Sequence, residues 1–313
     1  MTEISILIAV YNAENKIMKT INSIKNQTFK NFECIIVDDG STDNTLNILK
    51  KINDKRFKIL ESSHNGLTKS LNIGLSNACG KYLSRIDADD IFMSNKLEVQ
   101  KKFMDNNPDV VLLSNDIDLI DKKENKLKTF KYPDKHNEIM KMLEKRMNSL
   151  PHSSLFIRNK ILQEIGGYRE EFYKAQDYDL ILRILDYGDI SNIPHVLSLQ
   201  RSDEKSITYD LSSNSQVEYS VLALASYYLR KLNKTDLISD RHFINEYKVW
   251  YESSVYKKTF KSRISRNKMK RYWKSKSMHL FSTELIKSFF YDIIWPIRPF
   301  LGYNAEIKKW IEN

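Results

Sequence analysis

The stretch ISILIAVYNAE, residues 4–14, joins a continuous apolar run to a short polar turn. The same change from apolar to polar occurs in CIIVDDGS at residues 34–41 and in YLSRIDADD at residues 82–90. Continuous apolar runs of this length are typical of parallel strands that are covered on both faces. Helical patterns lie between the runs, and residues 17–24 place three isoleucines on one helix face. The alternation predicts an α/β fold, a Rossmann-like, mostly parallel sheet with flanking helices.

Polar side chains cluster where these strands end, in the turns at residues 11–14, 38–41 and 87–90. In a doubly wound sheet such turns lie side by side on one edge, and ligands bind there. Several carboxylates in one crevice repel one another unless a cation or hydrogen-bond donors lie among them. Mg²⁺ and Mn²⁺ usually bind one or two carboxylates together with substrate phosphate oxygens. The pattern therefore predicts a nucleotide diphosphate ligand with Mn²⁺ or Mg²⁺ as cofactor.

Some of these polar residues also have a purely structural explanation. Asn12 and Ser41 each stand where a helix cap is expected, because short polar side chains accept hydrogen bonds from the first backbone N–H groups of a helix. A second acidic run, Asp116, Asp118 and Asp121, alternates with apolar residues and predicts a solvated strand edge.

The three turns and the blocks around them resemble family 2 of the inverting glycosyltransferases, which have the GT-A fold. The matching segments are residues 10–14, 37–43, 65–74, 80–90, 152–158, 166–168 and 175–180, within a resemblance that spans about residues 3–205. The resemblance implies transfer of a sugar from a nucleotide-diphosphate donor, a UDP-sugar at the level of the family. The acceptor it implies is a hydroxyl of a glycan or lipid-linked molecule, in cell-envelope polysaccharide or lipopolysaccharide synthesis.

The resemblance also implies a role for individual residues. It assigns the catalytic base to Asp177 and the metal to Asp89 and Asp90. It places the following residues at the donor: Val10, Tyr11, Glu14, Asp39, Lys69, Asp87 and Ala88. It places His152, Gln176 and Arg201 near the acceptor. Two alternatives stay open, because Lys69 also fits a solvated surface and His152 also fits packing beneath the turn at residues 166–167.

Asp177 has support from the residues themselves. A general base must lie within hydrogen-bond reach of the acceptor hydroxyl, and Asp177 directly precedes an apolar helical pattern at residues 178–185. An N-cap is the structural alternative for an aspartate at this point. The family usually has Glu before this Asp, whereas this chain has Gln176. One base without a second, nucleophilic carboxylate fits a single displacement with inversion.

Charge divides the chain into two parts. Residues 1–240 carry 34 Lys and Arg against 34 Asp and Glu, whereas residues 241–313 carry 16 against 6. We expect a GT-A domain over residues 1–210, with a donor half at 1–120 and an acceptor half at 121–210. A basic, aromatic-rich helical extension is expected over residues 211–313. Its residues 257–295 fit a solvated face, an anionic membrane surface or a second copy of the chain, and nucleic acid is not expected because no recognised motif is present.

No secretory signal and no apolar stretch of about 20 residues is found, which predicts a cytoplasmic protein, peripheral at the inner face of the plasma membrane if the extension binds lipid. Two other functions remain open. A sugar-phosphate nucleotidyltransferase would need a Gly-rich basic loop after the first strand, where residues 11–14 read YNAE. A non-catalytic membrane or nucleic-acid-binding module would rest on the basic extension alone.

Overall fold

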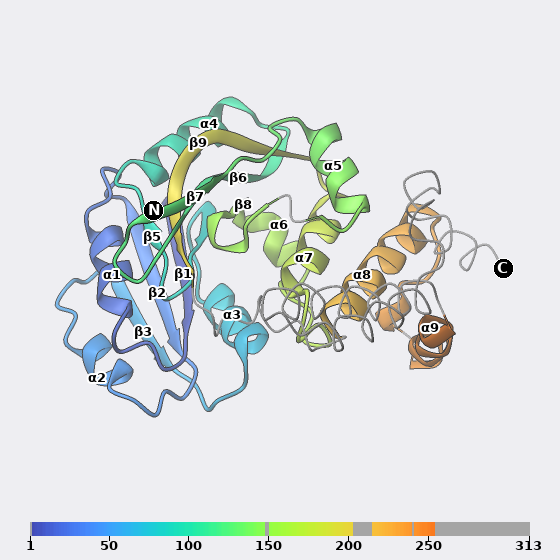
Figure 1. The fold of residues 1–313 in the computed structure, drawn as a ribbon, viewed down its shortest axis with the longest axis horizontal. Coiled ribbons are helices and arrows are strands. Elements are labelled where there is room, and N and C mark those ends of the chain that lie inside the picture. The colour runs from blue at the N-terminus through green and yellow to red at the C-terminus, as the bar shows by residue number, and fades with distance from the viewer. Residues whose placement is uncertain (1, 148–149, 203–214, 240, 254–313) are drawn as a thin grey trace, which may run out of the picture. The chain divides into compact units, whose positions relative to one another are not determined.

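The computed structural model of the 313-residue chain describes residues 2–147, 150–202, 215–239 and 241–253. The chain divides into two compact units, residues 1–143 with 147–204, and residues 144–146 with 205–313. All the strands described belong to the first unit (Figure 1).

The strands of the described residues form one nine-stranded sheet in the order β3-β2-β1-β4-β8-β6-β9-β5, with β7 paired to β6. The neighbours β3, β2, β1 and β4 are parallel, whereas β8 runs antiparallel to both β4 and β6. The strands are β1 Ile4–Val10, β2 Phe32–Asp38, β3 Phe57–Glu61, β4 Tyr82–Arg85, β5 Ile91–Phe92, β6 Val110–Ile120, β7 Lys126–Phe130, β8 Phe156–Arg158 and β9 Asp189–Arg201.

Helices flank this sheet, as the alternation of strand and helix predicts. The α-helices of the first unit are α1 Ile17–Lys25, α2 Thr45–Lys50, α3 Leu67–Ser76, α4 Lys96–Asn106, α5 His136–Glu144, α6 Asn159–Glu164 and α7 Gln176–Ile184. The helix α3 packs on β1 and β2, and α4 packs on β6 and β9. The α/β prediction with a sheet that is parallel in its first half is therefore confirmed.

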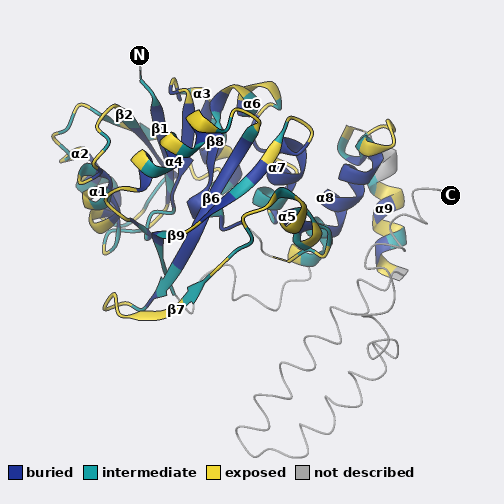
Figure 2. Ribbon diagram, turned by 90° about the horizontal axis from the view of Figure 1, so that it is seen from above, coloured by how far each residue is buried: buried dark blue, intermediate teal, exposed yellow. Residues whose placement is uncertain are grey.

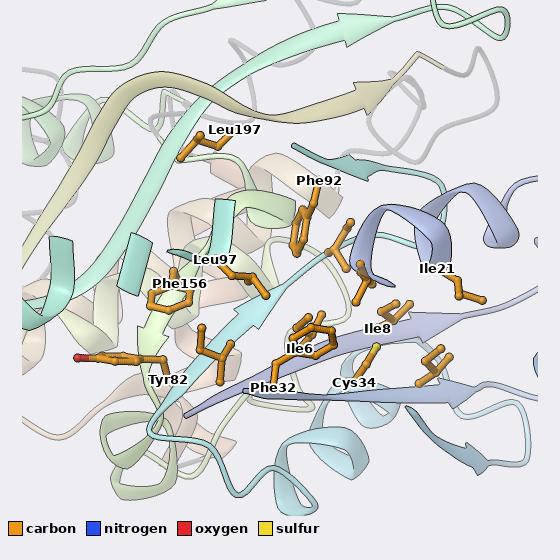
Figure 3. Close-up of a cluster of buried hydrophobic side chains, with 14 of the residues drawn as sticks. Ile6, Ile8, Ile21, Phe32, Cys34, Tyr82, Phe92, Leu97, Phe156 and Leu197 are labelled. Atoms are coloured by element: carbon orange, nitrogen blue, oxygen red, sulfur yellow. The ribbon is translucent and has the colours of Figure 1, made fainter. Parts of the chain in front are cut away.

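The core of the first unit forms where the apolar faces of these elements meet. Ile17, Ile21 and Ile24 of α1 are fully buried, as their spacing on one helix face predicts. Figure 3 shows Ile8 of β1 and Cys34 of β2 in the same cluster as Ile21. Burying each such side chain stabilises the fold by about 1.5–3 kcal/mol relative to leaving it exposed.

The structure corrects the expectation of a solvated strand edge at residues 116–121. The strand β6 lies inside the sheet, between β8 and β9, and Figure 2 shows most of it buried. Asp116 is 3% exposed, and its Oδ1 accepts hydrogen bonds from Tyr132 N at 3.0 Å and Asn192 Nδ2 at 3.0 Å. The prediction of solvent exposure from the alternation of acidic and apolar residues was wrong. Donors from other segments form hydrogen bonds with the Asp116 carboxylate, which makes its burial possible.

The register of the parallel strands fixes the position of the three polar turns. Val10 at the end of β1 pairs with Asp38 at the end of β2, and Leu7 pairs with Arg85 at the end of β4. The carboxyl ends of these strands therefore share one edge of the sheet, which is where α/β proteins bind ligands.

The second unit is helical where it is described, with α8 Ser215–Lys231, the 3₁₀ helix η3 Leu237–Ser239 and α9 Arg241–Ser253. Tyr247 of α9 donates to the carbonyl oxygen of Glu218 on α8 at 2.7 Å. The basic segment at residues 257–295 lies outside the described residues, and so does the expected boundary at residue 210. No helix in the described part of the chain is long and apolar enough to cross a membrane.

Candidate active site

Hydrogen bonds tie the turn after β1 to the turn after β2. Asn12, with φ at 50°, accepts from Thr42 N at 2.8 Å through its side-chain oxygen, and its own backbone N–H donates to Ser41 Oγ at 3.0 Å. Glu14 Oε2 accepts from Asn44 N at 2.9 Å. The predicted caps are corrected here: α1 begins after Lys16 and α2 after Asn44, and Asn12 and Ser41 join the two turns instead.

The residues predicted to contact the nucleobase lie in different surroundings. Val10 is in the hydrophobic core, and its carbonyl oxygen accepts from Asp39 N at 2.8 Å. Tyr11 is 45% exposed, and its ring lies 4.3 Å from the His64 ring, centroid to centroid. Of these two predicted residues, only Tyr11 offers a side chain that a ligand could reach.

Asp39 is buried, and protein donors occupy both of its carboxylate oxygens. Oδ1 accepts from Asn65 N at 2.8 Å and from Ser70 Oγ at 2.9 Å, and Oδ2 accepts from Gly66 N at 2.9 Å. The carboxylate therefore fixes the segment that leads into α3. Lys69, on the same helix, is half-exposed and lies 3.6 Å from Glu170 Oε2.

The turn after β4 carries three predicted donor and metal residues. Asp87 accepts a hydrogen bond from Arg85 Nη2 at 2.5 Å. The carbonyl oxygens of Ala88 and Asp90 both accept from Thr20 Oγ1 on α1, at 3.0 and 2.8 Å. Thr20 thus holds the backbone of the turn, so that Asp87 and Asp89 project from a fixed loop.

Asp89 and Asp90 differ in exposure and in partners. The side chain of Asp89 is 31% exposed and lies 3.3 Å from Lys16 Nζ. Asp90 is buried and accepts from Arg201 N at 3.0 Å and from the side chain of Ser153. Burial raises the pKa of both carboxyls, and the charge of Asp87 raises them further. The structure therefore favours Asp89 as the carboxylate available to a cation, with Asp90 in a structural position.

A divalent metal fits this turn only with help from its substrate. Within the described residues, no group of three or more His, Cys, Asp or Glu side chains is arranged to hold a metal ion. Two carboxylates of the turn are accessible, Asp87 and Asp89. Burial and the charge of Asp87 raise the pKa of Asp89, and Lys16 lowers it. Mg²⁺ and Mn²⁺ bound through one carboxylate and substrate phosphates need no larger set.

Asp177 is the second residue of α7, two positions after Ala175, which has φ at 54°. Its Oδ1 accepts from Tyr178 N at 2.8 Å. Burial raises the pKa of Asp177, whereas the hydrogen bond from Tyr178 N and the charge of Arg85 lower it. Gln176 is the first residue of α7. The helix start thus presents a partly exposed carboxylate whose proton affinity is above the ordinary value, which suits a general base.

His152 belongs to the 3₁₀ helix η1, His152–Ser154, and its Nε2 lies 2.9 Å from Tyr168 Oη. Burial lowers the pKa of His152 well below its ordinary value, and Arg85 adds to the effect. A neutral imidazole therefore packs against Tyr168, which follows the turn at residues 166–167. Of the two explanations from sequence, these contacts with Tyr168 fit packing beneath this turn.

Arg201 ends β9 and binds the backbone of the acidic turn. Its Nε donates to the Asp89 carbonyl oxygen at 3.1 Å, and its Nη2 donates to Glu124 Oε1 at 3.3 Å. The guanidinium is 4% exposed, so it supports the acidic turn rather than presenting its charge to solvent.

Sequence reasoning missed several residues that surround these positions. Arg85 donates to Asp87 of the donor turn, Lys16 pairs with Asp89, and Tyr168 contacts His152. Arg85 stands two residues before Asp87 at the end of an apolar run, and an arginine in a strand that is otherwise buried was a signal that could have identified it.

The mixed α/β sheet with its flanking helices defines a GT-A fold. The model of glycosyl transferase family 2 matches residues 5–166. The chain belongs to glycosyltransferase family 2.

Relatives and solved structures agree with this assignment. The chain is 30% identical to an uncharacterised glycosyltransferase of Rickettsia typhi over 99% of this chain and 96% of the relative. It is 31% identical to an uncharacterised glycosyltransferase of Haemophilus influenzae over 73% of this chain and 75% of that protein. Staphylococcus aureus TarS (residues 1–349) in complex with UDP superposes with a TM-score of 0.60 at 17% identity, covering 92% and 91% of the two chains.

A second structural neighbour is the mannosyltransferase PcManGT from Pyrobaculum calidifontis, in complex with GDP-Man and Mn²⁺. Its TM-score is 0.54 at 15% identity, and the match covers 75% of this chain and 65% of that one. The GT-A prediction is thus confirmed at the level of the fold. The roles of individual site residues stay predictions.

Proposed function

We propose that this glycosyltransferase is an inverting, metal-dependent enzyme that transfers a sugar from a nucleotide-diphosphate donor, with UDP-sugars the first candidates. The acceptor is a hydroxyl of a glycan or lipid-linked molecule, in the synthesis of cell-envelope polysaccharide or lipopolysaccharide. One observation carries the proposal: the parallel strands β1, β2 and β4 end at one edge of the sheet, so the turns that hold Tyr11, Asp39 and Asp87 follow the same edge.

Donor binding is assigned to the edge where β1, β2 and β4 end. The exposed Tyr11 ring, beside His64, offers a stacking surface for the base. Asp39 acts indirectly, because it fixes the segment from Asn65 to Gly66 that borders this surface. TarS binds UDP and UDP-GlcNAc, and PcManGT binds GDP-Man, which supports a nucleotide-sugar donor here.

Asp89 is the residue proposed to hold Mn²⁺ or Mg²⁺, together with the donor diphosphate. When bound, the metal would supply positive charge to the leaving diphosphate. PcManGT carries Mn²⁺ with its donor, which supports this cofactor class. Thr20 and Arg201 keep the Asp89 backbone in place, so the carboxylate needs little reorganisation on binding.

Asp177 is the residue proposed to remove the acceptor proton. The acceptor oxygen forms a bond to the anomeric carbon while the bond from that carbon to the diphosphate oxygen breaks, and the hydroxyl proton passes to Asp177. Attack opposite the leaving group inverts the anomeric configuration. The raised pKa of Asp177 brings its proton affinity closer to working pH, which favours general-base catalysis.

The remaining expectations belong to the same proposal. The chain acts at the inner face of the plasma membrane, with residues 257–295 as the contact to anionic lipid or to a second copy of the chain. A sugar-phosphate nucleotidyltransferase has less support, because the turn at residues 11–14 has no glycine and no basic residue.

The test is donor hydrolysis, measured over a panel of nucleotide sugars with Mn²⁺ and with chelator. We expect release of the nucleotide diphosphate from one donor class with Mn²⁺ and none with chelator. Calorimetric titration with UDP and GDP gives a second readout that needs no acceptor. If no donor is hydrolysed and no nucleoside diphosphate binds, the proposal is wrong.

A further inference from the structure

The loop between α6 and α7 is held by two side chains of α3. Asn72 Nδ2 donates to the carbonyl oxygen of Tyr168 at 2.7 Å, and Tyr168 N donates back to Asn72 Oδ1 at 2.9 Å. One turn earlier on α3, Thr68 Oγ1 donates to the carbonyl oxygen of Phe172 at 3.2 Å. The Asn72 amide therefore pairs with both backbone groups of one residue, as a neighbouring strand would.

The loop approaches α3 closely because residue 167 is a glycine. A Cβ atom placed on Gly167 would lie 2.8 Å from Asn72 Oδ1 and 2.8 Å from Leu75 Cδ2, which is too close for atoms that are not bonded. At Gly166, nothing in the described part of the chain beyond its own neighbours lies within 4 Å of the corresponding position. Both glycines have positive φ, but only Gly167 is also required by the contact with α3.

The same loop is bound to α7 on its other side. Arg183 Nη2 donates to the carbonyl oxygen of Gly167 at 2.6 Å, and Arg183 Nε donates to Asp179 Oδ2 at 3.0 Å. Arg169 Nε, in the loop, donates to the same oxygen at 3.0 Å. Charge-assisted hydrogen bonds of this kind are stronger than neutral ones. The loop and the start of α7, which includes Asp177, are therefore joined into one body.

The helix that holds this loop is itself fixed in the donor half. Asp39 accepts from Gly66 N, directly before α3, and from Ser70 Oγ within it. The helix also packs on β1 and β2, the strands whose ends carry the first two polar turns. A continuous set of contacts thus runs from the donor edge of the sheet, through α3, to the loop that leads into α7.

We propose that Asn72 is a positioning residue for the catalytic base. Its amide ties the loop to α3, and the tie keeps α7, and with it Asp177, in place relative to the donor edge of the sheet. Tyr168 Oη also lies 2.9 Å from His152 Nε2, so the same tie supports a residue expected near the acceptor. The inference rests on the proposed function in treating Asp177 as the base.

Loss of the Asn72 amide should displace the loop and leave the domain folded. Another anchor holds α7, because Tyr178 Oη donates to the carbonyl oxygen of Leu143 on α5 at 2.6 Å. Leu180 and Ile184 of α7 are also fully buried in the core. A misplacement of about 1 Å can lower a rate by roughly 10²-fold even when its cause lies far from the chemistry. We therefore expect a loss of rate without a loss of donor binding.

Asn72→Leu tests the tie, because leucine has a similar volume and neither donates nor accepts a hydrogen bond. We expect kcat for donor hydrolysis to fall by roughly 10- to 100-fold, while the Kd for UDP from calorimetry stays within about twofold of wild type. Asn77→Leu is the matched control, because Asn77 follows the last residue of α3 and its Nδ2 donates to Ile73 O of that helix at 2.9 Å. An unchanged kcat in Asn72→Leu overturns the inference, and so does a rate loss that weaker UDP binding explains.

Gly167→Ala and Gly166→Ala test the same contact from the side of the loop. Both place a side chain on backbone with positive φ, but only the methyl group at position 167 meets Asn72 Oδ1. We expect Gly167→Ala to lower kcat as Asn72→Leu does, and Gly166→Ala to retain more of the rate. Equal losses in the two variants would mean that backbone conformation, and not the contact with α3, governs the rate, which overturns the inference.

Hydrogen–deuterium exchange gives a readout that needs no reaction. In the free Asn72→Leu protein, exchange over residues 166–178 should be faster than in wild type, because Tyr168 N–H loses its acceptor. Unchanged exchange there overturns the inference. If Asn72→Leu does not fold, Asn72→Asp replaces it with the same expected direction, because its carboxylate repels the carbonyl oxygen of Tyr168. A wild type that neither hydrolyses a donor nor binds a nucleotide refutes the proposed function, whereas the exchange comparison still decides whether Asn72 holds the loop.

Discussion

Lys16 Nζ lies 3.3 Å from Oδ2 of Asp89, so the residue before α1 pairs with the carboxylate proposed to hold the metal. Both side chains are about one third exposed, at 32% and 31%. An ammonium group and a divalent cation compete for the same carboxylate oxygen. Metal binding at Asp89 therefore requires Lys16 to release this contact or to share it with the donor phosphates.

Replacing Lys16 by Met should tighten metal binding. A partly exposed ion pair is worth up to about 1 kcal/mol, so the Mn²⁺ concentration that half-saturates the UDP complex should fall by up to about fivefold. Titration calorimetry with Mn²⁺ at fixed UDP measures the change. Lys19→Met is the control, because Lys19 pairs with Glu124 instead. Weaker binding in Lys16→Met would show that Lys16 assists the phosphates rather than competing with the metal.

Asp89→Asn and Asp90→Asn should separate the two adjacent carboxylates. We expect Asp89→Asn to lose Mn²⁺-stimulated hydrolysis, because it removes the accessible anionic ligand. Asp90→Asn should keep the stimulation, since an amide oxygen can still accept from Arg201 N. Hydrolysis with and without chelator measures both. Loss of stimulation in a folded Asp90→Asn protein would instead restore Asp90 as a ligand.

Asp177→Asn should remove the general base and leave donor binding in place. General-base catalysis contributes roughly 10²–10⁴-fold, so kcat should fall by about that factor while UDP affinity changes little. Steady-state kinetics and calorimetry give the two values. Gln176→Ala, at the neighbouring position, is expected to retain most of the rate. A fall of less than about tenfold in Asp177→Asn would place the base elsewhere.

Activity and stability should depend on pH in opposite directions at Asp177. Its pKa is raised in the folded state, so the base gains its proton, and kcat/KM declines, as pH falls through that value. The folded state binds this proton more tightly than the unfolded state, so the stability contribution is present at low pH and lost as pH rises through the folded pKa. Thermal unfolding of Asp177→Asn should therefore match or exceed wild type at pH 7. A clear loss of stability there would contradict the direction.

The parallel half of the fold was predictable because its signal is local. The apolar run at residues 4–10 predicts a strand, and the spacing of the isoleucines in α1 predicts a helix. Each pattern is formed by residues that lie close together in the chain. The other half of the sheet, from β8 to β5, was not predictable in this way. Its strand β6 is buried because it pairs with β8 and β9, which lie far along the chain. Asp116 has the local pattern of a surface residue, and hydrogen bonds from the distant donors Tyr132 N and Asn192 Nδ2 make its burial tolerable.

The candidate site divides in the same way. The turn at residues 87–90 is recognisable because several carboxylates follow one strand. Which of them remains accessible depends on Arg201 and Ser153, which arrive from β9 and η1. Arg85 could not be assigned a role from sequence, because its burial depends on segments far along the chain, such as Leu155, whose carbonyl oxygen accepts from Arg85 N at 3.0 Å.

The position of Asp177 depends on an ion-pair cluster one turn into α7. Asp179 is 1% exposed and accepts from Arg169 and from Arg183 Nε, the latter at 3.0 Å. Asp179→Ala would leave two largely buried guanidinium groups without this carboxylate, which should cost about 3–5 kcal/mol of unfolding free energy. Urea unfolding measures it, with Glu164→Ala as control, because Glu164 forms an exposed pair with Lys160. If Asp179→Ala costs no more than the control, the cluster does not anchor α7, and the placement of Asp177 must come from its other contacts.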